Sequence, residues 1–183
     1  MPTAIVTGCA GFIGSHLIDE LLKKNWTVIG IDNFHPYYNR KLKELNLQNA
    51  LKNKNFNFIE GSILVSEDLE KLPKNIDFLF HFAAIAGVRN SILHPKEYFE
   101  INLEGTKKLL ERFQHIGKII FASTSSVYGD VPNTHFPVKE TEPLQPISPY
   151  GESKKLAEEF CQHFSLITKT KLSILRFYTV FGP

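Results

Sequence analysis

Short apolar runs rich in isoleucine, valine and phenylalanine alternate along the chain with longer stretches of helical periodicity. Strands that are buried on both faces read as continuous apolar runs, and strands that alternate with helices form parallel sheets. The pattern predicts an α/β fold, a doubly wound parallel sheet in three α/β/α layers. The predicted strands are 3–7, 27–31, 56–60, 77–82, 117–122 and 172–178. The predicted helices are 12–24, 38–52, 66–72, 95–114 and 149–168.

The composition narrows the classes of function. The 183 residues suffice for one domain with a well-buried core. Because 21 basic residues are offset by 19 acidic ones, no electrostatic footprint for nucleic acid is present. Cys9 and Cys161 are too few for a disulfide framework or a zinc cluster. The start of the chain has no basic n-region and no apolar run is long enough to span a bilayer, so we expect a cytoplasmic protein without a membrane partner.

Two segments interrupt the simple alternation. A basic run from Arg40 to Lys54 also contains Leu42, Leu45, Leu47 and Leu51, and we interpret it as the solvated face of an amphipathic helix. The longest irregular stretch, 129–148, holds four prolines and leads directly into Pro149 and Tyr150. A loop of this length without regular structure in a compact domain is usually functional.

A glycine-rich segment after the first predicted strand indicates a dinucleotide site. Gly8, Gly11 and Gly14 lie between this strand and the first predicted helix. Such glycines allow a tight turn and let backbone N–H groups approach a pyrophosphate at a helix N-terminus. Asp32 ends the second strand, where a carboxylate accepts hydrogen bonds from an adenosine ribose and repels a 2′-phosphate. The pattern favours NAD over NADP, although Asp32 and Asn33 also fit an ordinary turn.

Tyr150 and Lys154 stand four residues apart at the start of the last predicted helix. A helix brings such positions to one face, where a lysine ammonium can lower the pKa of a phenol and make it a usable general base. The spacing alone also describes a surface tyrosine beside a solvated lysine. The dinucleotide signature earlier in the same chain favours the catalytic interpretation.

Six ordered motifs give the chain a resemblance to a known family. It resembles the extended short-chain dehydrogenase/reductase group, namely the NAD-dependent nucleotide-sugar epimerases and dehydratases. The resemblance implies a Rossmann-type NAD-binding domain over residues 1–183. The motifs are Thr7-Gly8-x-x-Gly11-x-x-Gly14, His81-Phe82-Ala83-Ala84, Asn102-x-x-Gly105-Thr106, Ser123-Thr124-Ser125-Ser126-Val127-Tyr128-Gly129, Pro149-Tyr150 with Lys154, and Arg176-Phe177-Tyr178.

The resemblance also implies which residues contact the cofactor. Lys154 is expected to hold the nicotinamide ribose. Asn102 is expected either near the cofactor or as a buried amide that ties two strands together, and the two roles are compatible. The other contacts implied are Gly8, Gly11, Phe12, Ile13 and Gly14 at the pyrophosphate, Asp32 and Asn33 at the adenosine ribose, Phe82, Ala83 and Ala84 along the middle of the cofactor, and Tyr178 at the nicotinamide end.

One motif departs from the family pattern after the third predicted strand. Where the family usually has Gly-Asp, with the aspartate at the adenine amino group, this chain reads Gly61-Ser62-Ile63. The Ser62 hydroxyl can accept a hydrogen bond, but a neutral contact is weaker than one to a carboxylate. We therefore expect Ser62 and Ile63 at the adenine and a lower affinity for NAD.

The catalytic motif favours reversible oxidation at a single carbon. Tyr150 is the expected base, and Thr124 is expected to hydrogen-bond the same sugar oxygen, although a hydroxyl at a strand end can also simply cap the backbone. The similar 4,6-dehydratases carry Asp-Glu directly after this threonine, whereas this chain has Ser125-Ser126. The missing carboxyl pair favours a 4-epimerase with NAD, and His81, His94 and His115 lack the spacing of a metal site.

The segments around Phe34, Arg89 and Arg176 look most like UDP-glucuronate 4-epimerases. Ser125, Ser126 and Thr179 are then expected to hydrogen-bond the C5 carboxylate of the sugar. Arg89 is either its charge partner or a residue that orders its own loop. We expect a UDP-sugar substrate and allow for a homodimer.

Members of this family continue into a smaller C-terminal domain that binds the nucleotide and sugar, and this domain is not among the 183 residues. Two hypotheses follow from the sequence. The chain is the N-terminal half of an NAD-dependent UDP-sugar 4-epimerase, or it is a Rossmann module that binds NAD without turnover.

Overall fold

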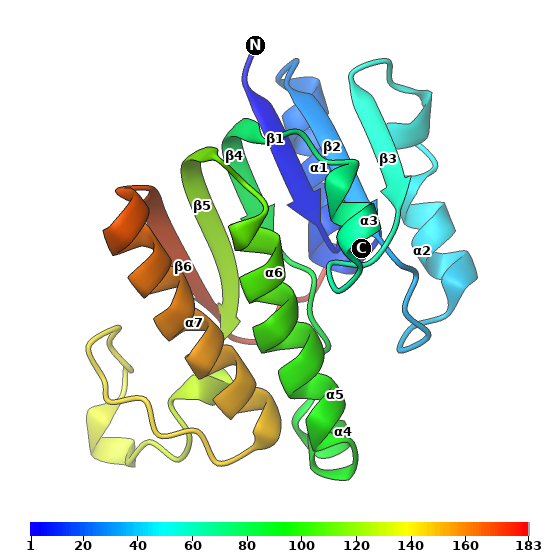
Figure 1. The fold of residues 1–183 in the computed structure, drawn as a ribbon. Helices are drawn as coiled ribbons and strands as arrows, with labels where there is room; N and C mark the ends of the chain where they lie inside the picture. Colours follow the sequence, from blue (N-terminus) through cyan, green and yellow to red (C-terminus); the bar gives the residue numbers. More distant parts are fainter. Residues whose placement is uncertain (183) are drawn as a thin grey trace.

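The computed structural model describes residues 1–182, which form a six-stranded parallel sheet (Figure 1). The strand order is β3-β2-β1-β4-β5-β6, and Ile5 of β1 pairs with Ile29 of β2 on one side and Leu79 of β4 on the other. The predicted doubly wound sheet is confirmed. The strands are β1 Thr3–Thr7, β2 Thr27–Asp32, β3 Phe56–Glu60, β4 Asn75–His81, β5 His115–Thr124 and β6 Lys171–Phe177.

Helices lie on both faces of the sheet. In Figure 1, α3, α6 and α7 lie in front of the strands, whereas α1 lies behind them and contacts α2. Within residues 1–182, no helix combines the length and the apolarity needed to cross a bilayer. The α-helices are α1 Phe12–Lys23, α2 Arg40–Leu47, α3 Ser66–Glu70, α4 Val88–Leu93, α5 Pro95–Phe99, α6 Gly105–Glu111 and α7 Pro149–Thr168. The shorter turns are η1 Ala50–Lys52, η2 Glu100–Glu104, η3 Ser125–Val127 and η4 Asn133–His135, of which η2 is a π-helical turn.

Two predicted helices are divided in the structure, and one helix was not predicted. The predicted helix 38–52 consists of α2 and η1, because the Asn39 side chain accepts from the N–H of Lys41 and starts α2 two residues later than expected. The predicted helix 95–114 is interrupted by η2. The helix that was not predicted is the short α4. It ends before Pro95, because the residue before a proline disfavours the helical region.

The basic residues of the run from Arg40 to Lys54 are solvated as predicted, except Lys43. Leu42 and Leu45 are 58% and 61% exposed, whereas Lys43 is only 8% exposed. Lys43 Nζ lies 3.2 Å from Asp32 Oδ1, and Asn46 Nδ2 donates to the Ala10 carbonyl at 2.9 Å. Polar contacts with β2 and the glycine turn therefore bury Lys43 on the same side of α2 as Leu47, and Leu42 and Leu45 remain exposed.

The hydrophobic core has one part on each face of the sheet. Alternate residues of β1 enter opposite parts, with Ile5 packing toward α6 and α7 and Val6 toward α1. On the α1 side, the half-buried Phe78, Phe80 and Phe82 follow one another along β4 and the loop after it. Trp26 packs on Phe78 at the far end of this row, with ring centroids 4.8 Å apart.

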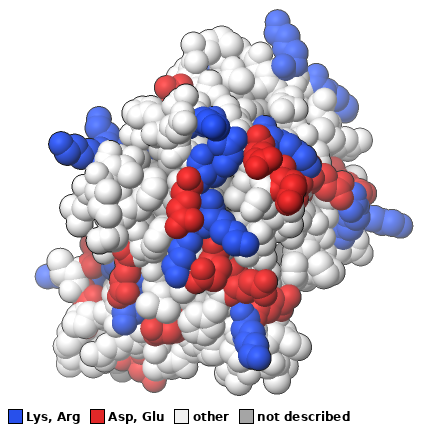
Figure 2. All heavy atoms as spheres, in the orientation of Figure 1, with Lys and Arg blue, Asp and Glu red and all other residues white. Residues whose placement is uncertain are grey.

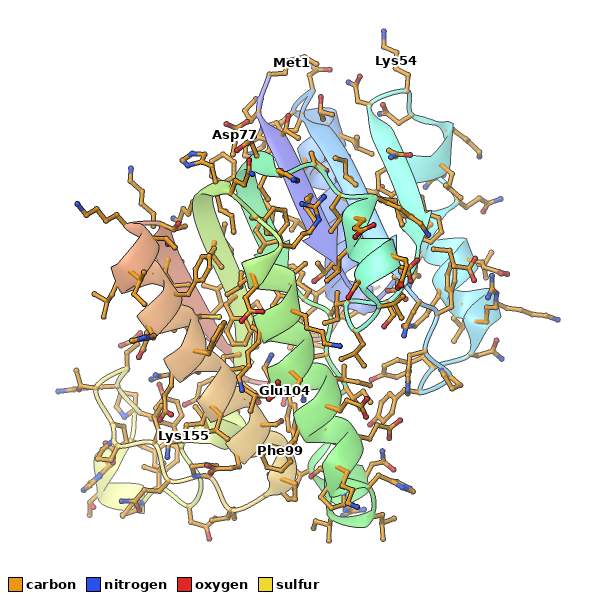
Figure 3. All side chains as sticks on the ribbon, in the orientation of Figure 1. Met1, Lys54, Asp77, Phe99, Glu104 and Lys155 are labelled. Carbon is orange, nitrogen blue, oxygen red and sulfur yellow. The ribbon has the colours of Figure 1, made fainter. Side chains whose placement is uncertain are left out.

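The surface in the orientation of Figure 1 mixes charges of both signs (Figure 2). Lys107 and Glu104 form an ion pair of 2.7 Å there, one of several between neighbouring helical positions. In Figure 3, Met1 and Asp77 lie at the end of the sheet where the strands begin, and Phe99 and Lys155 lie near the opposite end. That opposite end, where the strands finish, is where open α/β sheets bind their ligands.

Candidate active site and cofactor cavity

The glycine turn between β1 and α1 brings backbone close to backbone. Gly8 has a φ of +67°, and a Cβ built on it would lie 2.7 Å from the Ala83 nitrogen. A Cβ on Gly14 would meet the Gly8 carbonyl oxygen. Only glycine fits at these two positions. The turn delivers the chain into the N-terminus of α1, which has no side-chain cap and so leaves its N–H groups available to an anion.

A cavity lies beside this turn at the carboxyl ends of β1, β2 and β4. The uncapped N-terminus of α1 offers N–H groups to a pyrophosphate, and Asp32 on the wall offers a carboxylate to a ribose, so the residues present fit a dinucleotide. The predicted cofactor residues that line the cavity are Gly8, Gly11, Asp32, Asn33, Ser62, Ile63, Phe82, Ala83 and Ala84. Further lining residues, for which the motifs gave no signal, include His35, Tyr38, Lys43, Leu64, Ile85 and Ile101.

Several predicted residues lie away from the cavity wall. Phe12 is 40% exposed, Ile13 is half-buried and Gly14 is buried under the turn. Tyr178 directly follows β6, is 58% exposed and is not among the residues that line this cavity. The expected contact of Tyr178 with the nicotinamide end stays a prediction.

The predicted substrate residues divide into two groups. Ser125 and Ser126 form η3 directly after Thr124, and both are half-buried at the end of β5. Arg89 in α4 and Thr179 after β6 are exposed, and no contact brings either of them to the serines within residues 1–182. The structure thus places the serines next to Thr124 and leaves Arg89 and Thr179 apart from them.

The Asn102 side chain joins two segments of the protein by hydrogen bonds, and Asn102 is not among the residues that line the cavity. Its side chain is fully buried in η2, where Oδ1 accepts from the N–H of Ile85 at 2.8 Å. Its Nδ2 donates to the Ile85 carbonyl at 3.1 Å and to Ser153 Oγ at 3.1 Å. The expected cofactor contact stays a prediction. The buried amide joins other segments than the two strands expected. Asn102 ties the loop after β4 to α7, and Ser153 directly precedes Lys154.

Ser62 has fewer free groups than its type suggests. Its Oγ accepts from the N–H of Leu64 at 3.2 Å, and its own N–H donates to Asp68 Oδ2 at 2.9 Å. One lone pair and the hydroxyl hydrogen remain for a ligand. The weaker adenine contact expected at this position is consistent with this geometry.

Tyr150 and Thr124 are brought together at the carboxyl end of β5. Thr124 Oγ1 accepts from the N–H of Ser126 at 3.2 Å, so it also caps η3. Burial raises the pKa of the Tyr150 phenol, and the Thr124 hydroxyl acts in the opposite direction. The nearby Tyr37 and Tyr38 raise this pKa further. The phenol pKa is therefore raised in this structure, opposite to the lowering expected from Lys154, because desolvation is the largest effect.

Lys154 is a buried lysine of α7 that lies over the Phe121 ring. It is 2% exposed, and Nζ lies 4.1 Å from the centre of the Phe121 ring. Burial lowers its pKa to about 8, while Cys161 and Glu158 act in the opposite direction. Burial and the Lys154 charge lower the pKa of His81 to about 3, so this histidine is a neutral member of the core. Because its pKa stays above neutral pH, Lys154 is mostly a cation at pH 7 and can donate hydrogen bonds to a ligand.

Residues 4–183 match the NAD dependent epimerase/dehydratase family. The chain belongs to this family. The chain is 45% identical to an uncharacterized UDP-glucose epimerase of Bacillus subtilis, and the match covers 98% of the chain and 57% of that protein. It is 38% identical to UDP-glucuronate 4-epimerase of Thermodesulfobacterium geofontis, over 98% of its length and 56% of the relative.

Solved structures support the same assignment. The crystal structure of UDP-glucuronic acid 4-epimerase from Bacillus cereus in complex with UDP-glucuronic acid and NAD superposes with a TM-score of 0.89 at 39% identity. The match covers 99% of the epimerase/dehydratase chain and 58% of that structure. NAD is therefore the cofactor of the family and of its solved relative. The chain spans a little over half the length of the relatives named here.

We expect Gly11→Val to abolish NAD binding while the fold persists. Gly11 lines the cavity and has an ordinary φ, and a Cβ there would meet only the Gly8 oxygen at 3.2 Å. The branched side chain would instead occupy the space that a pyrophosphate needs. Isothermal titration with NAD measures the loss, and the unfolding midpoint of the variant should stay within a few degrees of wild type. Unchanged NAD affinity would remove the glycine turn from the cofactor site.

Proposed function

We propose that the chain is the NAD-binding and catalytic half of a nucleotide-sugar 4-epimerase that acts on UDP-glucuronate. The observation that carries the proposal is the placement of Tyr150 and Thr124 together at the strand ends, with Ser125 and Ser126 next to them. A dehydratase needs an acid and a base at those two positions. With hydroxyls there, a reaction at a single carbinol carbon is supported best.

The roles of the residues follow from what each atom can donate or accept. The Tyr150 phenolate takes the proton from the sugar C4 hydroxyl, and the Thr124 hydroxyl donates a hydrogen bond to the same oxygen. The buried ammonium of Lys154 stabilises the phenolate and donates to the nicotinamide ribose. NAD, when bound, would supply the acceptor for the hydride of the sugar C4 and the donor for its return, and return to the opposite face of the sugar would invert this carbon.

UDP-glucuronate is proposed as the substrate because hydroxyl groups cluster beyond Thr124. Ser125 and Ser126 can donate to a carboxylate at C5, and Thr179 follows β6 where galactose-type epimerases usually have asparagine. Arg89 is exposed and can pair with the carboxylate when the sugar is bound. The relatives named UDP-glucuronate 4-epimerase support this choice.

A module that binds NAD without turnover is the second candidate. The relatives are nearly twice as long as the residues that match them. Binding energy from remote parts of a substrate normally positions the reacting atoms. A chain that contacts little of the nucleotide would hold the cofactor and release the sugar.

The test is an assay of UDP-glucuronate conversion to UDP-galacturonate. We expect the 183 residues alone to bind NAD and to convert the sugar at least a hundredfold more slowly than a version joined to the C-terminal half of a relative. The joined protein should prefer UDP-glucuronate to UDP-glucose. If it converts UDP-glucose equally well, the proposed substrate is wrong. If it binds NAD but converts neither sugar, the second candidate replaces the epimerase.

A further inference from the structure

The Asp32 carboxylate at the end of β2 is almost saturated by donors from the protein. Its Oδ2 accepts from the N–H of Ala10 at 3.1 Å, and its Oδ1 accepts from the N–H of Phe34 at 2.8 Å. The Lys43 ammonium donates to the same Oδ1 at 3.2 Å. A carboxylate offers about four acceptor positions. About one position therefore remains for a hydroxyl of the adenosine ribose.

Lys43 has unused donors at the same place. Its side chain is 11% exposed and lines the cofactor cavity beside Asp32. Among residues 1–182, Asp32 is its hydrogen-bonding partner, so about two of the three N–H groups remain for a ligand. A lysine on the cavity wall with free donors can serve the ribose hydroxyl that Asp32 does not.

The position of Lys43 is fixed by the rest of α2. Asn46 donates to the Ala10 carbonyl at 2.9 Å, which holds the helix to the glycine turn. Arg40 donates from both terminal nitrogens to the Glu60 carboxylate, at 2.9 and 3.0 Å, and lies over the Phe34 ring. The ammonium is thus held in front of Asp32 before any ligand arrives.

The pair changes how a 2′-phosphate would be rejected. A lone carboxylate repels the phosphate of NADP at close range in a poorly screened site. An ammonium 3.2 Å from that carboxylate attracts the phosphate with comparable strength, so the two effects largely cancel. The exclusion of NADP by Asp32 is then weaker than the carboxylate alone would produce.

We propose that Lys43 is a specificity-determining residue of the cofactor cavity, which donates to the adenosine ribose and weakens the discrimination of Asp32 against a 2′-phosphate. The proposal concerns cofactor choice and does not depend on which sugar the protein converts. Its test therefore uses binding alone.

The experiment measures the dissociation constants of NAD and NADP for the 183-residue chain by isothermal titration. Lys43→Met should weaken NAD binding about tenfold, since a charge-assisted hydrogen bond is lost. It should weaken NADP binding at least a hundredfold, so the preference for NAD rises at least tenfold. Asp32→Ser should move the preference at least tenfold toward NADP, because the ammonium then faces the phosphate unopposed.

Lys41→Met is the matched control, because Lys41 lies on the same helix and is exposed. It should leave the ratio of the two constants within about twofold of wild type. If Lys43→Met fails to fold, the double variant Asp32→Ser with Lys43→Met removes both buried charges and is compared with Asp32→Ser alone. A ratio that does not change on loss of Lys43, or that changes equally with Lys41→Met, overturns the proposal.

Discussion

Tyr150→Phe should reduce epimerisation by about 10²–10⁴-fold, the contribution of a general base. The substitution removes the phenol that takes the C4 proton, and it leaves the aromatic ring against Tyr98, whose centroid lies 6.0 Å away. Retention of NAD should stay close to wild type, because Lys154 and the glycine turn are unchanged. The activity is measured in the protein joined to the second half of a relative.

A pH profile distinguishes loss of the base from loss of structure. The wild-type rate should rise with pH toward the pKa of the phenol, which burial raises above its usual value. This rise of the rate with pH should be absent in Tyr150→Phe. Tyr37→Phe removes a hydroxyl that raises the pKa of Tyr150 but leaves the Tyr150 phenol in place, and it should keep most of the activity and the rise of the rate with pH. An active Tyr150→Phe variant with an unchanged rise of the rate would remove Tyr150 from the mechanism.

Lys154→Met should stabilise the fold and weaken NAD binding at least tenfold. The lowering of the Lys154 pKa from 10.5 to about 8 corresponds to about 3 kcal/mol of lost stability at neutral pH. Loss of the contact with the Phe121 ring offsets about 1–2 kcal/mol of the gain. The net increase in the free energy of unfolding is then about 1–2 kcal/mol, or about 2–8 °C in Tm.

The pH dependence of stability checks the cause of this gain. Between about pH 8 and pH 10.5 the unfolded chain binds more protons at Lys154 than the folded chain, so the free energy of unfolding should rise with pH. Lys154→Met should lack this rise. Lys155→Met, on the same helix with a half-exposed side chain, should show the wild-type rise and wild-type NAD binding. A less stable Lys154→Met variant that keeps its NAD affinity would contradict the assignment.

The parts of the fold that the sequence predicts best are those set by local chemistry. Apolar runs such as 3–7 mark strands because both of their faces are buried. Gly8 and Gly14 mark the cofactor turn because the backbone itself leaves no room for a Cβ there. Tyr150 and Lys154 need only the periodicity of a helix to share a face.

Other parts depend on contacts between distant segments. In the sequence Lys43 resembles a solvated residue, and its burial depends on the ion pair with Asp32 and on the hydrogen bond from Asn46 to Ala10. The motif around Asn102 implies a cofactor contact, whereas the Asn102 side-chain amide forms hydrogen bonds with Ile85 and Ser153, which lie far from it in the sequence. The raised pKa of Tyr150 results mainly from burial in the folded protein, and the spacing between two residues in the sequence does not predict burial.

The position of Trp26 makes folding and ligand binding separately observable. It is the single tryptophan of the chain and packs on Phe78 before β2 begins, whereas Asp32 at the other end of β2 lines the cofactor cavity. At about 3.3 Å per residue, the strand keeps the indole about 20 Å from that carboxylate. Intrinsic fluorescence excited at the indole band should therefore follow unfolding of the sheet and respond little to an occupied cavity. One optical signal can then show that a variant with impaired binding is still folded.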